Sequence, residues 1–268
     1  ETLSLLRSKH LEIPCLSTGC ALKDTGRREE TLAEIREYIA LAEKLGTPYI
    51  RILGDLTAAP MGEVDDEAVL SALKALVPDA EKAGVTLLVE TNGVYSDTAR
   101  LRDLLNRTES DNVAALWDVH HPYRFAGESP EETVQNLGAY IKYAHIKDSV
   151  MENGKVSYRL IGEGDLPIDD IIRTLNSINY EGYVSLTLPT SWRSIWGMSG
   201  AAAAFTTTSP APANMSGPRK PSSTSPSRRF WTGWWRNSPT STPSATPPWT
   251  TPAPTRNSGT MWTPSPAR

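Results

Sequence analysis

Cysteines, histidines and long apolar runs are scarce in this 268-residue chain, and each scarcity excludes a class of protein. The two cysteines, Cys15 and Cys20, form no CxxC pair and have no histidine nearby, which argues against a disulfide framework or a zinc knuckle. No apolar run approaches the roughly 20 residues of a membrane helix, and no signal-peptide pattern opens the chain. We therefore expect a cytoplasmic protein that does not interact with membranes.

Acidic residues are absent from residues 188–268. All 31 of them lie at or before Thr187 together with 19 of the 27 basic residues, so residues 1–187 carry a formal charge of −12. The remaining 8 basic residues give residues 188–268 a charge of +8. Binding to nucleic acid depends on clustered Lys and Arg, so the acidic part of the chain disfavours a nucleic-acid partner.

Residues 188–268 also lack Val, Tyr and His, but hold 14 of the 21 prolines and 7 of the 8 tryptophans. Low-complexity Pro, Ser and Thr bury too little apolar area to offset the entropy of ordering, so we expect a disordered tail. Out-of-frame translation of a GC-rich gene would also produce this abrupt change. We favour it over a natural linker and over a nucleic-acid-binding tail of Trp and Arg. Two regions are predicted, a folded domain over 1–187 and a tail over 188–268.

Short apolar runs alternate with helical patterns before Thr187. Strands are expected at IPCLSTGC, TPYIRILGD, GVTLLVETN, VAALWDVHH, YIKYAHIKD and GYVSLT. Helices are expected at 29–45, 65–82, 96–106, 130–137 and 168–178. The first of these helices shows an apolar stripe of Leu32, Ile35, Ile39, Leu41 and Leu45. Strict alternation of strand and helix predicts an α/β fold with a parallel sheet.

Six strands are fewer than the eight of a closed (β/α)8 TIM barrel. Because the chain opens inside a helical pattern, we expect about six βα units, corresponding to strands three to eight, with the N-terminal strands missing. Such an incomplete barrel would leave the edges of its sheet unpaired.

Three of the expected strands end in a residue that can bind a divalent metal. Glu90, Asp118 and His145 are 28 and then 27 residues apart, which matches one strand, one helix and one loop per step. Two carboxylates and an imidazole suit Mn²⁺, Mg²⁺, Co²⁺ or Zn²⁺. A single strand-end Asp is often only a helix cap, but the equal spacing of three such residues favours a metal site.

Other polar residues near these strand ends are candidates for substrate binding or support. Of two adjacent histidines we expect His121 to contact substrate and His120 to pack or cap. Asp148 is expected to support His145. Arg51 could bind a hydroxyl or a phosphate of the substrate, and an ion pair with a neighbouring carboxylate is equally open. Lys147 is a candidate for substrate charge, although such a lysine is more often solvated.

The segments LLVETNG, ALWDVHHP, AHIKD, LIGEGDLPIDD and GYVSL together resemble the xylose isomerase-like TIM-barrel superfamily, over about residues 11–186. The resemblance implies a divalent metal held by Glu90, Asp118 and His145, with a second Glu at the end of the last strand. It also implies that His121 contacts the substrate. Thr187 stands where that second Glu is expected, which departs from the pattern of the family.

The resemblance implies an isomerase or epimerase that acts on a small sugar or polyol, with no nucleic acid and with oligomers possible. The metal chelates a carbonyl and the neighbouring hydroxyl, and a carboxylate removes the carbon-bound proton between them. We assign Glu90 as that catalytic base. Two alternatives stay open: an inactive, truncated or frameshifted product, and a metal-dependent enzyme related to the apurinic endonucleases.

Overall fold

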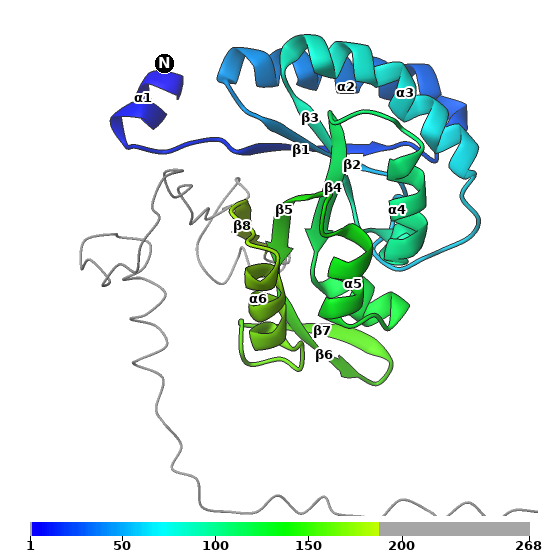
Figure 1. The fold of residues 1–268 in the computed structure, drawn as a ribbon, viewed down its shortest axis with the longest axis vertical. Coiled ribbons are helices and arrows are strands. Elements are labelled where there is room, and N and C mark those ends of the chain that lie inside the picture. Colours follow the sequence, from blue (N-terminus) through cyan, green and yellow to red (C-terminus); the bar gives the residue numbers. More distant parts are fainter. Residues whose placement is uncertain (1, 188–268) are drawn as a thin grey trace, which may run out of the picture. The chain divides into compact units, whose positions relative to one another are not determined.

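A curved sheet of six parallel strands is the main element of the computed structural model, which describes residues 2–187 (Figure 1). Neighbouring strands follow the order β1-β2-β3-β4-β5-β8, and every pairing is parallel. The strands are β1 (Cys15–Ala21), β2 (Tyr49–Leu53), β3 (Thr86–Glu90), β4 (Val113–Asp118), β5 (Ile141–Ile146) and β8 (Tyr183–Leu186). Within residues 2–187 no further strand pairs with the outer edge of β1 or of β8. The expected incomplete TIM barrel is confirmed.

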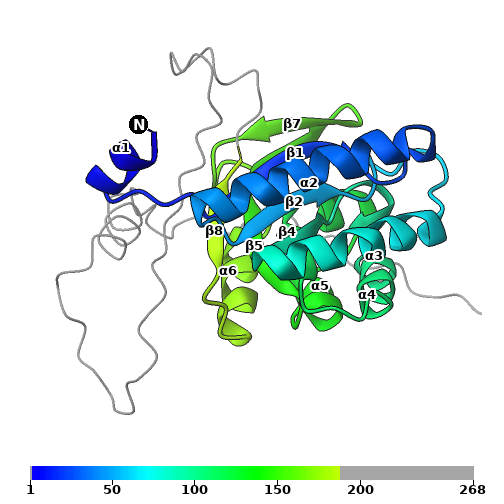
Figure 2. The same ribbon diagram turned by 90° about the horizontal axis from the view of Figure 1, so that it is seen from above.

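Five helices, α2 to α6, follow strands of the sheet and lie along one of its faces, whereas α1 precedes β1 and lies apart from that face (Figures 1 and 2). The helices are α1 (Thr2–Ser8), α2 (Arg28–Leu45), α3 (Asp66–Ala83), α4 (Thr98–Asn106), α5 (Pro130–Leu137) and α6 (Ile168–Ser177). The five helices expected between strands are therefore present, with ends displaced by at most two residues. Their right position follows from local signals, because apolar periodicity and capping residues are read within a few turns of chain.

Local capping groups define several of these helix ends. The Asp65 carboxylate accepts hydrogen bonds from two backbone N–H groups in the first turn of α3. Ser129 and Glu132 form a reciprocal capping box at the start of α5. Gly46 ends α2 in the left-handed conformation, with φ of 70°, which glycine adopts without a Cβ clash.

The predicted apolar stripe of α2 is wrong at one position, Leu41. Leu32, Ile35 and Ile39 are buried as expected, but Leu41 is 43% exposed and Ala42 takes its place in the core. A helix of 3.6 residues per turn brings position 42, three residues after Ile39, onto the buried face.

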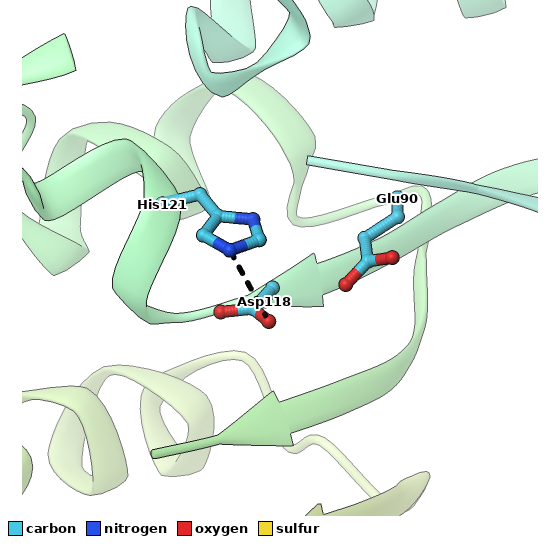
Figure 3. Close-up of side chains that lie close together, drawn as sticks. All are labelled: Glu90, Asp118 and His121. Carbon is cyan, nitrogen blue, oxygen red and sulfur yellow. Dashed lines mark ion pairs between the residues drawn. The ribbon is translucent and has the colours of Figure 1, made fainter. Parts of the chain in front are cut away.

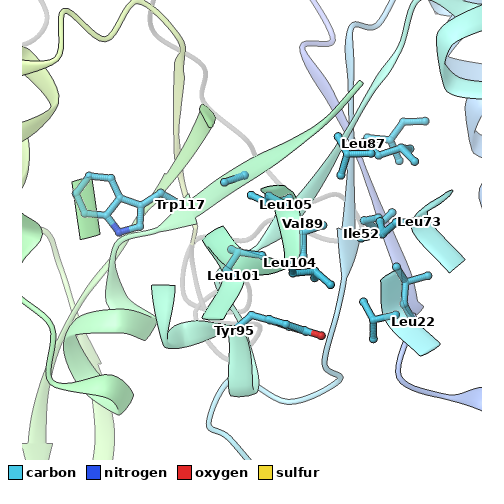
Figure 4. Packing of buried hydrophobic residues seen from close by; sticks show 14 of the residues in the cluster. Leu22, Ile52, Leu73, Leu87, Val89, Tyr95, Leu101, Leu104, Leu105 and Trp117 are labelled. Atoms are coloured by element: carbon cyan, nitrogen blue, oxygen red, sulfur yellow. The ribbon is translucent and has the colours of Figure 1, made fainter. Parts of the chain in front are cut away.

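Apolar residues on the two faces of the sheet belong to two different clusters. The larger cluster lies between sheet and helices and includes Leu87 and Val89 of β3 (Figure 4). A smaller one, Leu88, Ala114, Leu116 and Tyr143, lies on the other face of β3, β4 and β5. Because strand side chains alternate, the last residues of β3 and β4 share the face of the smaller cluster, the face opposite the helices.

A hairpin after β5 was not expected from the sequence. Strands β6 (Asp148–Glu152) and β7 (Lys155–Arg159) pair antiparallel around Asn153 and Gly154, whose φ angles are 50° and 75°. Asn-Gly between two short strands is the usual signal of a two-residue hairpin turn. Three short helical segments complete the connections: Thr25–Arg27, Gly93–Ser96 and the π-helical Pro122–Ala126.

Two remaining expectations concern membranes and the tail. Within residues 2–187 no helix has the length and apolar character needed to cross a membrane. The predicted tail, residues 188–268, lies outside the described residues, so its expected disorder stays a prediction.

Candidate metal centre at the strand ends

Glu90, Asp118 and His145 come together at the carboxyl end of the sheet. Glu90 and Asp118 are the last residues of β3 and β4, and His145 lies directly opposite Asp118 in the β4–β5 ladder. His145 Nδ1 is 3.3 Å from Glu90 Oε1 and 4.0 Å from Asp118 Oδ2. The parallel register therefore converts their spacing in sequence into proximity.

His121 completes a compact group with the two carboxylates. One potential ligand atom each from Glu90, Asp118 and His121 lies within 4.8 Å of the others, and all three residues are buried (Figure 3). His121 Nδ1 is 3.0 Å from the backbone carbonyl of Thr91. Because a carbonyl only accepts, Nδ1 carries the proton, and Nε2 presents a lone pair toward Asp118 at 3.8 Å.

Lys147, which the sequence left as a candidate for substrate charge or a solvated residue, also belongs to the site. It is only 8% exposed, and its Nζ lies 2.7 Å from Asp118 Oδ2 and 2.9 Å from His121 Nε2. Burial lowers the pKa of Lys147, but the charges of Asp118 and Glu90 outweigh burial and raise it above its usual value. The position two residues after His145 is the signal that could have identified Lys147, because alternate strand residues share a face.

Both carboxylates are ionised at neutral pH despite their burial. Burial raises the pKa of Glu90, but the hydrogen bond and charge of His145, together with the charge of Arg51, bring it below its usual value. Burial likewise opposes ionisation of Asp118, but the positive charge of Lys147, which also donates a hydrogen bond to Asp118, lowers its pKa strongly. The site therefore offers two anionic oxygen donors on side chains that are almost completely buried.

Arg51 points to Glu90 from the neighbouring strand. Its Nη1 is 3.4 Å from Glu90 Oε2, so of the two possibilities left open by the sequence the structure shows the ion pair. The Arg51 side chain is 20% exposed, and its buried Nε has no hydrogen-bond partner among the described residues. This arginine thus has donor capacity that the ion pair does not use.

The side chains of His120 and Asp148 form hydrogen bonds to residues around the site rather than to the group of ligand atoms. His120 Nε2 lies 3.0 Å from Ser149 Oγ, and burial lowers the pKa of His120 to about 3, so the ring is neutral. The Asp148 carboxylate was expected to support His145. It instead accepts hydrogen bonds from the backbone N–H groups of Gly162 and Gly164, because these amides face it across the loop that follows β7.

Comparisons with known proteins identify the family of the fold that carries these residues. A family model described as "Xylose isomerase-like TIM barrel" matches residues 1–206. The chain belongs to this family. Fructoselysine 3-epimerase of Shigella flexneri is 26% identical over 181 residues, which are 64% of this chain and 63% of that protein. The chain thus spans less than two thirds of the length of this relative.

Two solved structures of xylose isomerase-like fold carry a metal in their names. The IOLI protein "with a binding zinc atom" has a TM-score of 0.58 and 20% identity, covering 69% of this chain and 72% of that one. A xylose isomerase-like TIM barrel protein from Mycobacterium smegmatis in complex with magnesium has a TM-score of 0.57 and 19% identity, covering 69% of each chain. At these identities the likeness shows the fold alone.

Thr187 stands one residue beyond β8 in this xylose isomerase-like sheet. Its backbone N–H donates to the carbonyl of Ile146 at 3.0 Å, which continues the ladder between β5 and β8. Ser185 faces Tyr143 of the smaller cluster, and strand alternation gives Thr187 the same side. A hydroxyl at this position supplies neither the charge nor the proton affinity of a carboxylate.

Proposed function

We propose that the chain is a divalent-metal-dependent isomerase or epimerase of a small sugar or polyol. The observation that carries the proposal is the convergence of Glu90, Asp118 and His145, with His121 beside them, at the carboxyl end of a xylose isomerase-like sheet. The name of the Shigella relative as a 3-epimerase supports a sugar substrate, and the zinc and magnesium of the two solved structures support a divalent cation.

The donor set fits such a cation. Glu90, Asp118 and His145 would hold it, and the lone pair of His121 Nε2 faces the same group of atoms. Carboxylate oxygens and imidazole nitrogens accommodate Mn²⁺, Mg²⁺, Co²⁺ and Zn²⁺, so the ligand types do not choose among these four ions. When bound, the cation would act as a Lewis acid that polarises a substrate carbonyl and the adjacent hydroxyl.

Glu90 is the base in this proposal. Its carboxylate is ionised at neutral pH because His145 and Arg51 offset the effect of burial on its pKa. It can therefore accept the proton of the hydroxyl-bearing carbon next to the carbonyl. Arg51 holds a hydroxyl or a phosphate of the substrate with the donors that Glu90 leaves free. His121, which the sequence suggested as a substrate contact, has one acceptor lone pair on Nε2, and in this proposal that lone pair faces the cation.

A single base favours isomerisation over epimerisation. One carboxylate can return the proton to the neighbouring carbon on the same face, whereas epimerisation needs a second acid on the opposite face. Thr187 cannot be that acid, because its hydroxyl does not titrate near neutral pH. A relative is named as an epimerase, so measuring whether the product is the isomer or the epimer tests this argument directly.

Proton exchange measures the proposed step without knowledge of the product. We would incubate the full chain with Mn²⁺ and a panel of ketoses and ketose phosphates in D2O, and follow loss of the carbon-bound proton by NMR. Glu90→Gln should slow the exchange about 10²- to 10⁴-fold, the contribution of a positioned general base. The exposed Glu67→Gln is the matched control. Exchange that persists in EDTA, or that Glu90→Gln leaves unchanged, would contradict the proposal.

Thr187 favours a second outcome, a chain that keeps the fold and has lost the activity. This outcome belongs with the frameshift hypothesis, which concerns the codons after Leu186. Reading the coding DNA in all three frames should then show a Glu codon followed by an acidic, Val-containing segment in another frame. Continuous repetitive coding without such a segment would refute the frameshift and leave Thr187 as a native feature of the site.

A further inference from the structure

Lys147 is placed as an internal cation within the cluster of ligand atoms. It follows β5 directly and is 8% exposed. Its Nζ donates to Asp118 Oδ2 at 2.7 Å and contacts His121 Nε2 at 2.9 Å. Asp118 and His121 are two of the three residues whose ligand atoms lie within 4.8 Å of one another. The ammonium therefore uses the one acceptor lone pair of His121 Nε2 and one of the acceptor positions of Asp118, which a metal ion at the same place would need.

Two cations cannot both occupy these contacts. A lone pair of Asp118 or His121 that accepts a hydrogen bond from Nζ is unavailable to a metal ion. Like charges a few ångströms apart also repel strongly where little water screens them. The nearest carboxylates, Asp118 and Glu90, are 1% and 6% exposed, so water screens the site poorly.

We propose that Lys147 competes with the divalent cation for Asp118 and His121. This inference rests on the proposed metal-dependent function and goes beyond it, because it makes Lys147 a residue that sets metal affinity. In the metal-free protein the ammonium neutralises Asp118. A divalent cation must displace it, and its double charge gives it an advantage over Na⁺ or K⁺ in doing so.

A purely structural role for Lys147 predicts different behaviour. If the lysine only stabilised the fold, its removal would weaken the protein with or without metal and would leave or reduce metal affinity. If Lys147 competes with the metal, its removal should lower the stability of the metal-free protein and raise the affinity for the metal. The reason is that Asp118 then has no cationic partner and is available to the metal.

Titration of the full chain with Mn²⁺ by calorimetry separates the two roles. Lys147→Met keeps the length of the aliphatic stem and removes the charge, so its Kd should fall at least about tenfold below that of the wild type. Lys147→Arg keeps a cation and should bind no more tightly than the wild type. Lys142→Met, at an exposed position on β5, is the matched control and should change nothing.

Thermal unfolding supplies a second measurement. In EDTA the Lys147→Met variant should melt below the wild type, and saturating Mn²⁺ should raise its melting temperature more than that of the wild type. If both proteins bind Mn²⁺ and the variant binds no more tightly, the competition is overturned while the metal site stands. If neither protein binds Mn²⁺, the proposed metal-dependent function fails together with this inference.

Discussion

Replacing Asp118 by asparagine should strongly destabilise the metal-free protein. The carboxylate is 1% exposed and accepts from Lys147 Nζ at 2.7 Å, while its other oxygen accepts from the backbone N–H of His120 at 3.1 Å. Asparagine preserves the shape and can still accept from His120, but it leaves the buried ammonium without its counter-charge. Breaking a buried pair in this way costs about 3–5 kcal/mol of unfolding free energy.

Urea unfolding in EDTA, followed by far-UV circular dichroism, would measure this cost. Arg107→Met is the control: it removes a charge paired with Glu67 at the surface, where the two side chains are 46% and 71% exposed. Exposed pairs contribute about 0–1 kcal/mol, so this variant should unfold almost as the wild type does.

The double variant Asp118→Asn, Lys147→Met tests the physical reason. With both charges gone, no unpaired ion remains, and its loss of stability should be less than the sum of the two single losses by about 2 kcal/mol or more. The reasoning is refuted if Asp118→Asn costs no more than the surface control, or if the two single effects simply add.

Three further predictions concern other parts of the chain. Thr187→Glu should lower the Kd for Mn²⁺ about tenfold by adding a carboxylate donor, and Thr187→Gln, which lacks the charge, should not; equal calorimetric titrations of the two would refute the placement of this residue at the site. Partial burial raises the pKa of the half-buried Cys15 to about 12, so iodoacetamide at pH 8 should modify it in the native protein roughly 10³-fold more slowly than in urea, as followed by peptide mapping; similar rates would contradict the raised pKa. A Cβ on Gly164 would overlap the Asp148 carboxylate, so Gly164→Ala should cost about 1–3 kcal/mol in urea unfolding, whereas Gly19→Ala, with open space around it, should cost far less.

The charges of the site explain why these experiments converge on a few residues. Glu90 and Asp118 are paired with Arg51 and Lys147, so each buried carboxylate has a cationic partner without a metal. A bound divalent cation would make it positive, a state that an anionic substrate or one more carboxylate would offset. Metal affinity, stability and substrate charge are therefore linked through the same four side chains.

Much of the fold follows from local signals in the sequence. The helix ends were predicted because caps, glycines and apolar periodicity act over a few residues, as at Asp65 and Gly46. The parallel sheet followed from the alternation of helices with strands buried on both faces. The hairpin around Asn153 also follows from a local signal, because Asn153 and Gly154 adopt the positive φ angles of a two-residue turn.

The sequence by itself determined that Glu90, Asp118 and His145 lie at or next to the ends of three strands, although β5 continues to Ile146, and a parallel sheet requires such ends to lie at one edge. Only the tertiary structure decided which atoms meet there. In the folded chain Lys147 donates to Asp118, and Arg51 forms an ion pair with Glu90. Asp148 accepts from the backbone N–H of Gly162 instead of contacting His145. These choices depend on the register between strands and on which acceptor lies nearest in space. Both are long-range properties, set by packing between segments that are far apart in the chain.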